Sequence, residues 1–203
     1  MEEAIFLPHL VDNRNELLYL ELVTRLTNIT GAEIVNMIFT NSRRNSRFND
    51  KTQEVWYCAF EHDTAVQEVA HHRKRIQDDT DEFGNEVIYR EFFADFMGVF
   101  QDAQGLPPGE GILGADPKTA YPLGQKLAHQ LRAEGGRGII YPSVRRPGGI
   151  CLVAFHRGIV QNARLGDRWK MSWSKEGELN MEKIGEEQIY QTGPVIRTSY
   201  TDR

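Results

Sequence analysis

The chain has 203 residues, of which 40% are hydrophobic and 26% are charged, values typical of a soluble globular protein. A chain of this length buries enough apolar surface to fold without disulfides or a structural metal. Acidic residues outnumber basic ones by 29 to 24, and the formal net charge of -5 argues against a general attraction to nucleic acids or anionic membranes.

The N-terminal third is predicted to contain helices, a polar loop and one strand. Leucines on one helical stripe predict a helix over residues 14–28, whereas the apolar segment 32–40 fits either a helix or a strand. Residues 41–53 form a polar, arginine-bearing loop. The segment EVWYCAF, residues 54–60, is short and rich in aromatic and β-favouring residues, which predicts a buried strand.

The middle of the chain continues with a helix and an ambiguous apolar segment. Good helix formers predict a helix over residues 61–79, with Asp63 or Thr64 as the candidate N-cap. Residues 80–86 have the composition of a turn. Residues 87–100 fit both the helical and the strand pattern, and their aromatic content favours a strand.

The C-terminal half begins with a long Pro/Gly-rich loop, residues 103–117, a candidate flap or insertion. A helix over 120–136 ends in a glycine pair, as left-handed helix caps prefer. Within residues 135–155, GIIY and CLVAF predict two buried strands around YPSVRRPGG, and WKMSW (169–173) alternates as a strand does. The tail from Ser174 is polar and poorly patterned.

The two cysteines and the histidines indicate neither a disulfide framework nor a metal site. Cys58 and Cys151 each lie in an apolar run, so we expect buried free thiols. No CxxC or HExxH occurs, and no metal-ligand spacing is found. The first 30 residues lack the pattern of a signal peptide, and no apolar run approaches the ~20 residues of a membrane span. We therefore expect a cytoplasmic protein.

Three polar residues lie where chemistry is commonly placed, beside apolar strands. Arg47 precedes the strand EVWYCAF, Glu68 lies on the helix after it, and Ser143 follows Pro142 at the end of the GIIY strand. Each also fits an ordinary role. Arg47 fits a solvated loop, Glu68 a surface pair worth about 0.3–0.5 kcal/mol, and Ser143 a turn that bonds its own backbone.

Taken in order, these residues form a pattern that resembles the RES-domain family, named for its Arg, Glu and Ser motif residues. The matching segments are RF-N, the strand WYCAF, TAxxEV on a helix, and GIIYPSVR followed by GGxCLVAF. The resemblance covers about residues 42–173 of a single predicted α+β domain, 1–203, with a helical extension over 1–40. Where the family usually has Gly-Arg-Trp, this chain has Ser-Arg-Phe at residues 46–48.

The resemblance implies an ADP-ribosyltransferase-like fold, whose split sheets open a nucleotide cleft for NAD. It implies Arg47, Glu68 and Ser143 as catalytic residues and Tyr57 as a residue that lines the pocket. Arg47 and Arg145 are expected to contact the phosphates, Tyr57 to stack on nicotinamide, and Ser143 to bond nicotinamide or its ribose. Glu68 is expected to stabilise positive charge on the ribose, or to orient the ribose hydroxyls or the attacking water.

Many RES-domain proteins are toxins of bacterial toxin–antitoxin pairs that degrade NAD. The resemblance therefore implies an NAD+ glycohydrolase or phosphorylase, with no metal, covered by a small helix-turn-helix antitoxin. The sequence leaves the oligomeric state open, and the resemblance makes a homodimer one of the possible states; direct contact with nucleic acid or a membrane is not expected. Two alternatives stay open: a mono-ADP-ribosyltransferase that modifies a macromolecule, and a non-catalytic RES-like module that binds a nucleotide or a partner.

Overall fold

The computed structural model describes residues 3–6, 28–80, 86–174 and 178–185. Within these ranges the strands form one sheet of eight, in the order β4-β5-β6-β2-β1-β3-β7-β8, in which only the β4–β5 pair is parallel. The strands are β1 (Glu3–Phe6), β2 (Trp56–Ala59), β3 (Val87–Phe96), β4 (Gln101–Asp102), β5 (Gly138–Pro142), β6 (Ile150–Ala154), β7 (Val160–Trp173) and β8 (Leu179–Ile184). The helices are α2 (Gly31–Asn41), α3 (His62–Thr80) and α4 (Pro117–Ala133), with short 3-10 turns η1 (Gly111–Leu113) and η2 (Arg157–Ile159).

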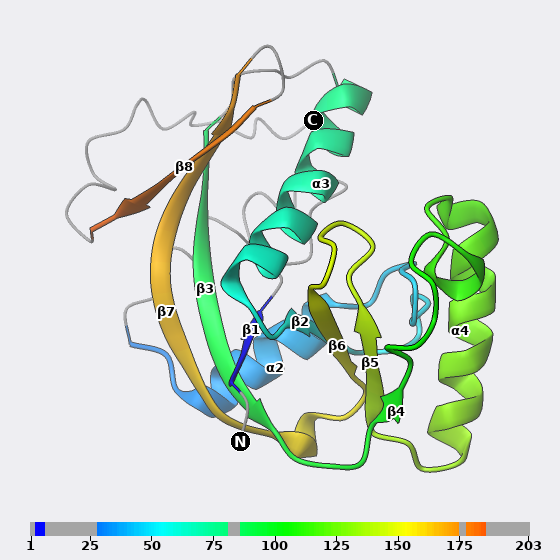
Figure 1. The fold of residues 1–203 in the computed structure, drawn as a ribbon. Coiled ribbons are helices and arrows are strands. Elements are labelled where there is room, and N and C mark those ends of the chain that lie inside the picture. The colour runs from blue at the N-terminus through cyan, green and yellow to red at the C-terminus, as the bar shows by residue number, and fades with distance from the viewer. Residues whose placement is uncertain (1–2, 7–27, 81–85, 175–177, 186–203) are drawn as a thin grey trace, which may run out of the picture.

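The predicted α+β class is confirmed, and the sheet has two halves that meet at β1. One half contains β4, β5, β6 and β2, and the other contains β3, β7 and β8. Figure 1 shows the two halves diverging on either side of β1. Helix α3 contacts β1 and β2, where the two halves meet. Helix α4 contacts β5, which lies next to the edge strand β4.

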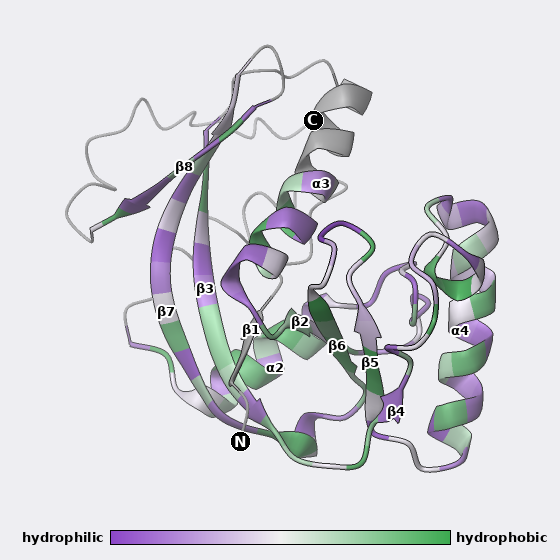
Figure 2. Ribbon diagram, viewed as in Figure 1, coloured by the Kyte–Doolittle hydropathy of each residue, from purple (hydrophilic) through white to green (hydrophobic). Residues whose placement is uncertain are grey.

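Strand β2 is buried on both faces, which explains why its sequence is a continuous apolar run. Trp56 and Cys58 belong to the core cluster that α2 completes, whereas Tyr57 and Ala59 belong to the cluster on the side of α3 and α4. Figure 2 shows the apolar character of β2 and β6 at the centre of the molecule. A strand covered on both faces reads as continuously apolar because alternate side chains enter two cores.

The segment 32–40, which fits either a helix or a strand by sequence, is helical. Thr30 caps α2, since its hydroxyl accepts from Glu33 N at 3.3 Å and its own N–H donates to Glu33 Oε2 at 2.9 Å. This reciprocal capping box satisfies two backbone donors at the start of the helix. Because the pattern Thr-x-x-Glu is visible in the sequence, it was the available indication that this segment is helical.

Helix α3 confirms the prediction over 61–79, but the proposed N-caps are wrong. The helix begins at His62, so Asp63 and Thr64 both lie inside its first turn. The carbonyl of Glu61 accepts from Ala65 N at 3.1 Å, and the Thr64 hydroxyl donates to Glu61 Oε2 at 2.6 Å. Glu61 therefore occupies the capping position, one residue before the helix.

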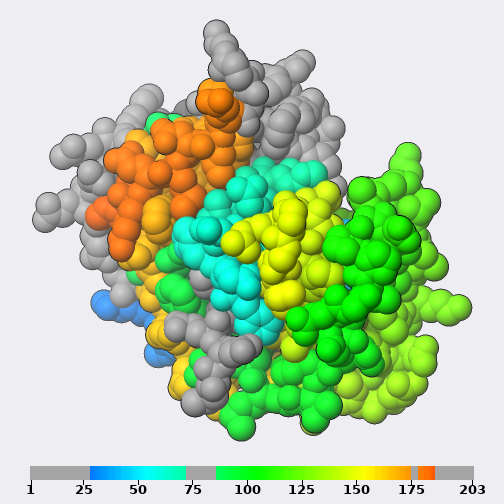
Figure 3. All heavy atoms as spheres, viewed as in Figure 1, coloured from blue at the N-terminus to red at the C-terminus, as the bar shows by residue number. Residues whose placement is uncertain are grey.

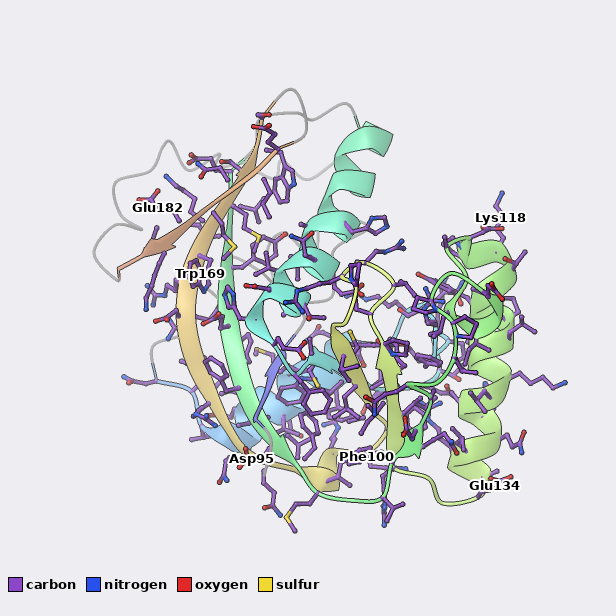
Figure 4. All side chains as sticks on the ribbon, in the orientation of Figure 1. Asp95, Phe100, Lys118, Glu134, Trp169 and Glu182 are labelled. Carbon is purple, nitrogen blue, oxygen red and sulfur yellow. The ribbon has the colours of Figure 1, made fainter. Side chains whose placement is uncertain are left out.

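Helix α4 starts earlier than predicted and ends at Ala133, three residues before the predicted end, and the predicted glycine pair follows it. Asp116 caps it by accepting from Lys118 N at 3.0 Å, and Pro117 follows in the first helical position, where a missing N–H costs nothing. At the other end Gly135 has a φ of +81°, and Gly136 N donates to Leu131 O at 2.7 Å. Figure 4 labels Lys118 and Glu134 near the two ends of this helix, at the edge of the molecule.

The strands of the second half are longer than the sequence indicated. The preference for a strand in 87–100 is confirmed over Val87–Phe96, and β7 extends well before the predicted 169–173. The expectation that the tail from Ser174 lacks pattern is wrong for β8, which pairs with β7. Both strands expose many polar side chains, so partner strands rather than hydrophobic alternation define them.

Two predictions concern segments mostly outside the described residues: the helix over 14–28 and the turn at 80–86. The predicted loop 103–117 is a loop that contains η1 and leads into the cap of α4. Among the helices that are described, none is both long enough and apolar enough to traverse a bilayer.

Candidate active site

The loop that carries Arg47 is held by a buried polar scaffold. Asn49 is fully buried, and its Nδ2 donates to Ser42 O at 3.0 Å and to Arg44 O at 2.8 Å. Its Oδ1 accepts from the Tyr57 hydroxyl at 3.0 Å, and that hydroxyl accepts from Phe48 N at 2.8 Å. The loop is polar in sequence because its turns bury backbone groups that must be paired.

The guanidinium of Arg47 lies against the segment that leads into α4. Its Nη1 donates to the carbonyls of Ile112 and Gly114, the latter at 3.2 Å. Its Cζ lies 5.7 Å from the centre of the Tyr121 ring, within the range of a cation–π contact. Arg47 is therefore a half-buried, oriented side chain rather than the solvated loop residue of the ordinary interpretation.

Glu68 and Ser143, 75 residues apart in the chain, are directly bonded. The Ser143 hydroxyl donates to Glu68 Oε1 at 2.6 Å. The Ser143 hydroxyl oxygen in turn accepts from the backbone N–H groups of Arg145 at 3.1 Å and Arg146 at 3.0 Å. Ser143 is only 2% exposed, so its hydroxyl is committed to the carboxylate and to its own turn. Glu68 thus points toward the β5–β6 turn and not outward as half of a surface pair.

The electrostatics of Glu68 combine burial with positive neighbours. Burial raises the pKa of this carboxyl above its ordinary value, while the bond from Ser143 and the charges of Arg145 and Arg47 act to lower it. Hydrogen bonds therefore join Glu68 to Ser143, and Ser143 to the backbone of Arg145. The positive charges of Arg145 and Arg47 both favour the ionised form of the Glu68 carboxylate.

Tyr57 is part of the core beneath this cluster. It is 5% exposed, and burial raises the pKa of its hydroxyl far above the usual range. Its two hydrogen bonds, described above, hold the Arg47 loop. Its place in the structure is thus that of a support for Arg47, and the stacking of its ring on nicotinamide stays a prediction.

The β5–β6 turn is tied to the first turn of α3 by Arg146. Its Nη1 donates to the Thr64 hydroxyl at 3.2 Å, and its guanidinium lies 4.0 Å from Glu61 and 3.9 Å from Asp63. Figure 3 shows this turn, in yellow, lying between α3 in cyan and the segment before α4 in green. Arg146 therefore serves the attachment of the turn, which leaves Arg145 as the arginine of this pair that acts on Glu68.

The cysteine prediction is confirmed, and no metal-binding group is found in the part of the chain that is described. Cys58 and Cys151 are buried free thiols, and burial raises the pKa of each well above its ordinary value. Among these residues no group of three or more His, Cys, Asp or Glu side chains could hold a metal ion.

Two polar residues of the site region escaped the sequence analysis. Asn49 belongs to the RF-N segment, so its proximity to Arg47 in the chain was an available indication. Gln125 lies on α4, and its amide donates to Ser46 O at 2.8 Å. Nothing in the sequence connects position 125 with a loop almost 80 residues earlier, because that contact depends on how α4 folds back over the loop.

A comparison with models of known protein families agrees with the motif pattern. The family model of the RES domain matches residues 24–174. The chain is also similar to a chain in the crystal structure of the M. tuberculosis MbcT–MbcA toxin–antitoxin complex, with 16% sequence identity and a TM-score of 0.45. That match covers 66% of this chain and 76% of the other. A comparison with curated proteins finds no match.

Proposed function

Because the chain belongs to the RES domain family, we propose that it is a RES-type toxin that cleaves the nicotinamide–ribose bond of NAD+. The observation that carries the proposal is the Ser143–Glu68 hydrogen bond of 2.6 Å, beside two arginines that act on the same carboxylate. A half-buried acid held in this way has no evident role in packing, since an apolar side chain would fill the position at lower cost.

Cleavage of the nicotinamide–ribose bond of NAD+ needs a carboxylate to stabilise positive charge but does not need a second group that acts as a general acid. Nicotinamide is cationic before the bond breaks, so it leaves as a neutral ring without a proton donor. Positive charge then develops on the ribose carbon, and an ionised Glu68 would stabilise it. Such fixed charges in a site that excludes water supply a large part of catalysis. Burial disfavours the ionised form of Glu68, whereas the hydrogen bond from Ser143 and the charges of Arg145 and Arg47 favour it.

Ser143 is assigned in this proposal to orienting Glu68. Its single proton is used on Glu68 Oε1 and its lone pairs accept two backbone N–H groups, so its bonding capacity is filled. Within the described part of the chain, only Oε1 of Glu68 is engaged, and Oε2 is the atom that would face the ribose. This role replaces the expected direct bond from Ser143 to nicotinamide or its ribose.

Arg47 is proposed to bind the pyrophosphate. A guanidinium carries five N–H donors, and the carbonyls of Ile112 and Gly114 engage Nη1 alone. Nε and Nη2 would therefore remain for two phosphate oxygens, in the planar geometry that arginine offers to phosphate. Arg145 would add a second positive charge.

The same site would serve a glycohydrolase, a phosphorylase or a mono-ADP-ribosyltransferase, which differ only in the group that attacks the ribose. For a toxin of this kind we propose control by an antitoxin that covers the site, as the family resemblance implies. The alternative of a non-catalytic module is disfavoured by the oriented carboxylate, because binding an anionic nucleotide does not require an acid fixed by a serine hydroxyl at 2.6 Å.

The test is NAD+ turnover by the purified chain, with product chromatography in buffers with and without phosphate. We expect release of nicotinamide, with ADP-ribose as co-product or a phosphorylated ADP-ribose when phosphate is present. Glu68→Gln should lower kcat at least roughly a hundredfold, the usual size of such electrostatic contributions. Glu134→Gln, the same change at the exposed residue that follows the last residue of α4, is the matched control. A folded wild-type protein that releases no nicotinamide in any buffer would refute the proposal.

A further inference from the structure

The backbone of the Arg47 loop is bound along its length by side chains of α4. Gln125 Nε2 donates to Asn45 Oδ1 at 2.6 Å and to Ser46 O at 2.8 Å, with Asn49 O at 3.2 Å as a third, shared acceptor. One amide thus spans the loop from one side of Arg47 to the other. An amide nitrogen has only two hydrogens, so its donor capacity is filled by these acceptors.

Two further residues on α4 lie against the backbone carbonyls of Arg47 and Phe48, which are between Ser46 and Asn49 in the loop. Arg132 Nη1 donates to Phe48 O at 3.3 Å. At Gly124 the helix comes so close that a Cβ added there would lie 2.4 Å from Arg47 O. Positions 124, 128 and 132 are four residues apart and share one face of the helix, with position 125 beside them. This face of α4 is therefore shaped to the loop.

The guanidinium of Arg47 is held by the segment that leads into this same helix. The carbonyls of Ile112 and Gly114, which bind Nη1, lie just before the cap of α4, and Tyr121 lies on its first turns. The main chain and the side-chain end of Arg47 are thus both attached to one unit, residues 111–133. An arginine fixed at both ends loses little further entropy when it binds a ligand.

We propose that Gln125 is a positioning residue that holds Arg47 in the geometry required to bind the pyrophosphate. The effect of Gln125 on the kinetics of NAD+ cleavage rests on the proposed function, whereas its effect on the placement of Arg47 does not. Asn49 and Tyr57 hold the loop from the core side, so the loop is expected to stay folded without Gln125. What Gln125 adds is the link between the loop and the unit that holds the guanidinium.

The variant Gln125→Glu is nearly isosteric and replaces the two donated hydrogens with a carboxylate oxygen facing carbonyls. We expect KM for NAD+ to rise roughly tenfold with kcat little changed, because contacts remote from the reacting bond contribute to binding in ground and transition states alike. Gln130→Glu makes the same change at an exposed position of α4 and should leave both constants unchanged.

A double-mutant cycle separates positioning from general support of the fold. If Gln125 acts through Arg47, Gln125→Glu should not lower kcat/KM any further once Arg47→Ala is present. Equal losses in the two backgrounds would show that the residue merely stabilises the protein, and would overturn the proposal.

A measurement without substrate decides the inference even if NAD+ is not turned over. Phenylglyoxal modifies accessible arginines, and mass spectrometry follows its rate at Arg47, with the exposed Arg137 as an internal reference. In Gln125→Glu the rate at Arg47 should rise at least roughly fivefold, the equivalent of one lost hydrogen bond, and the rate at Arg137 should not change. An unchanged rate at Arg47 would overturn the proposal, whereas a wild type without turnover would overturn only the proposed function.

Discussion

Replacing Ser143 with alanine removes the one hydrogen bond that the described residues make to the Glu68 carboxylate. The hydroxyl donates to Glu68 Oε1 at 2.6 Å and accepts the N–H groups of Arg145 and Arg146. With Ser143 only 2% exposed, an alanine side chain leaves no polar atom there to replace it. Burial would then raise the pKa of Glu68 with less opposition, because only the arginines would still favour the ionised form.

The magnitude follows from the strength of a hydrogen bond to a charged group, about 1.5–3 kcal/mol. Since each pH unit corresponds to about 1.4 kcal/mol, the acid limb of the kcat profile should move upward by roughly one to two pH units. Activity at neutral pH falls, and raising the pH restores part of it. The turn loses two further hydrogen bonds of about 1 kcal/mol each, so the unfolding free energy should fall as well.

The assay is the pH dependence of kcat for NAD+ cleavage in the wild type, in Ser143→Ala and in the hydroxyl-retaining Ser143→Thr. A titration of the Glu68 carboxyl by carbon NMR gives the same information without turnover. If the acid limb of Ser143→Ala coincides with that of the wild type, and only the plateau falls, the hydroxyl does not tune the charge of Glu68. The role assigned to Ser143 would then be wrong.

Three other substitutions follow from the site. Burial raises the pKa of Glu68 in the folded state, so the contribution of this group to folding stability is fully present in acid and is lost as the pH rises through the folded-state pKa. Glu68→Gln should therefore have a higher melting temperature than the wild type at neutral pH but not in acid. Thermal denaturation at the two pH values checks this. Gly124→Ala should raise KM for NAD+ by displacing Arg47, and should not yield the stability of about 1 kcal/mol that alanine normally adds to a helix; a higher melting temperature with an unchanged KM would contradict this. Tyr57→Phe leaves two buried partners in the Arg47 loop unpaired and should lower the unfolding free energy by about 1–3 kcal/mol in urea titrations, so an unchanged midpoint would count against the scaffold.

Segments with one dominant local pattern were predictable. The apolar run 54–60 contains strand β2, and the predicted helix 61–79 corresponds to α3. A short β-favouring run and a long stretch of good helix formers each suit one backbone conformation. The strand β8 was missed, since its polar side chains lie on an exposed ribbon and its conformation comes from pairing with β7.

The sequence alone indicated the family and the α+β class and singled out Arg47, Glu68 and Ser143 as candidate site residues, because order and spacing along a chain are properties of the sequence itself. Only the tertiary structure decided what those residues touch. The bond between Ser143 and Glu68 spans 75 residues, and the contact of Gln125 with Ser46 spans 79. Contacts at such separations depend on how strands pair and helices pack over the whole domain, and no local pattern in the sequence encodes their geometry.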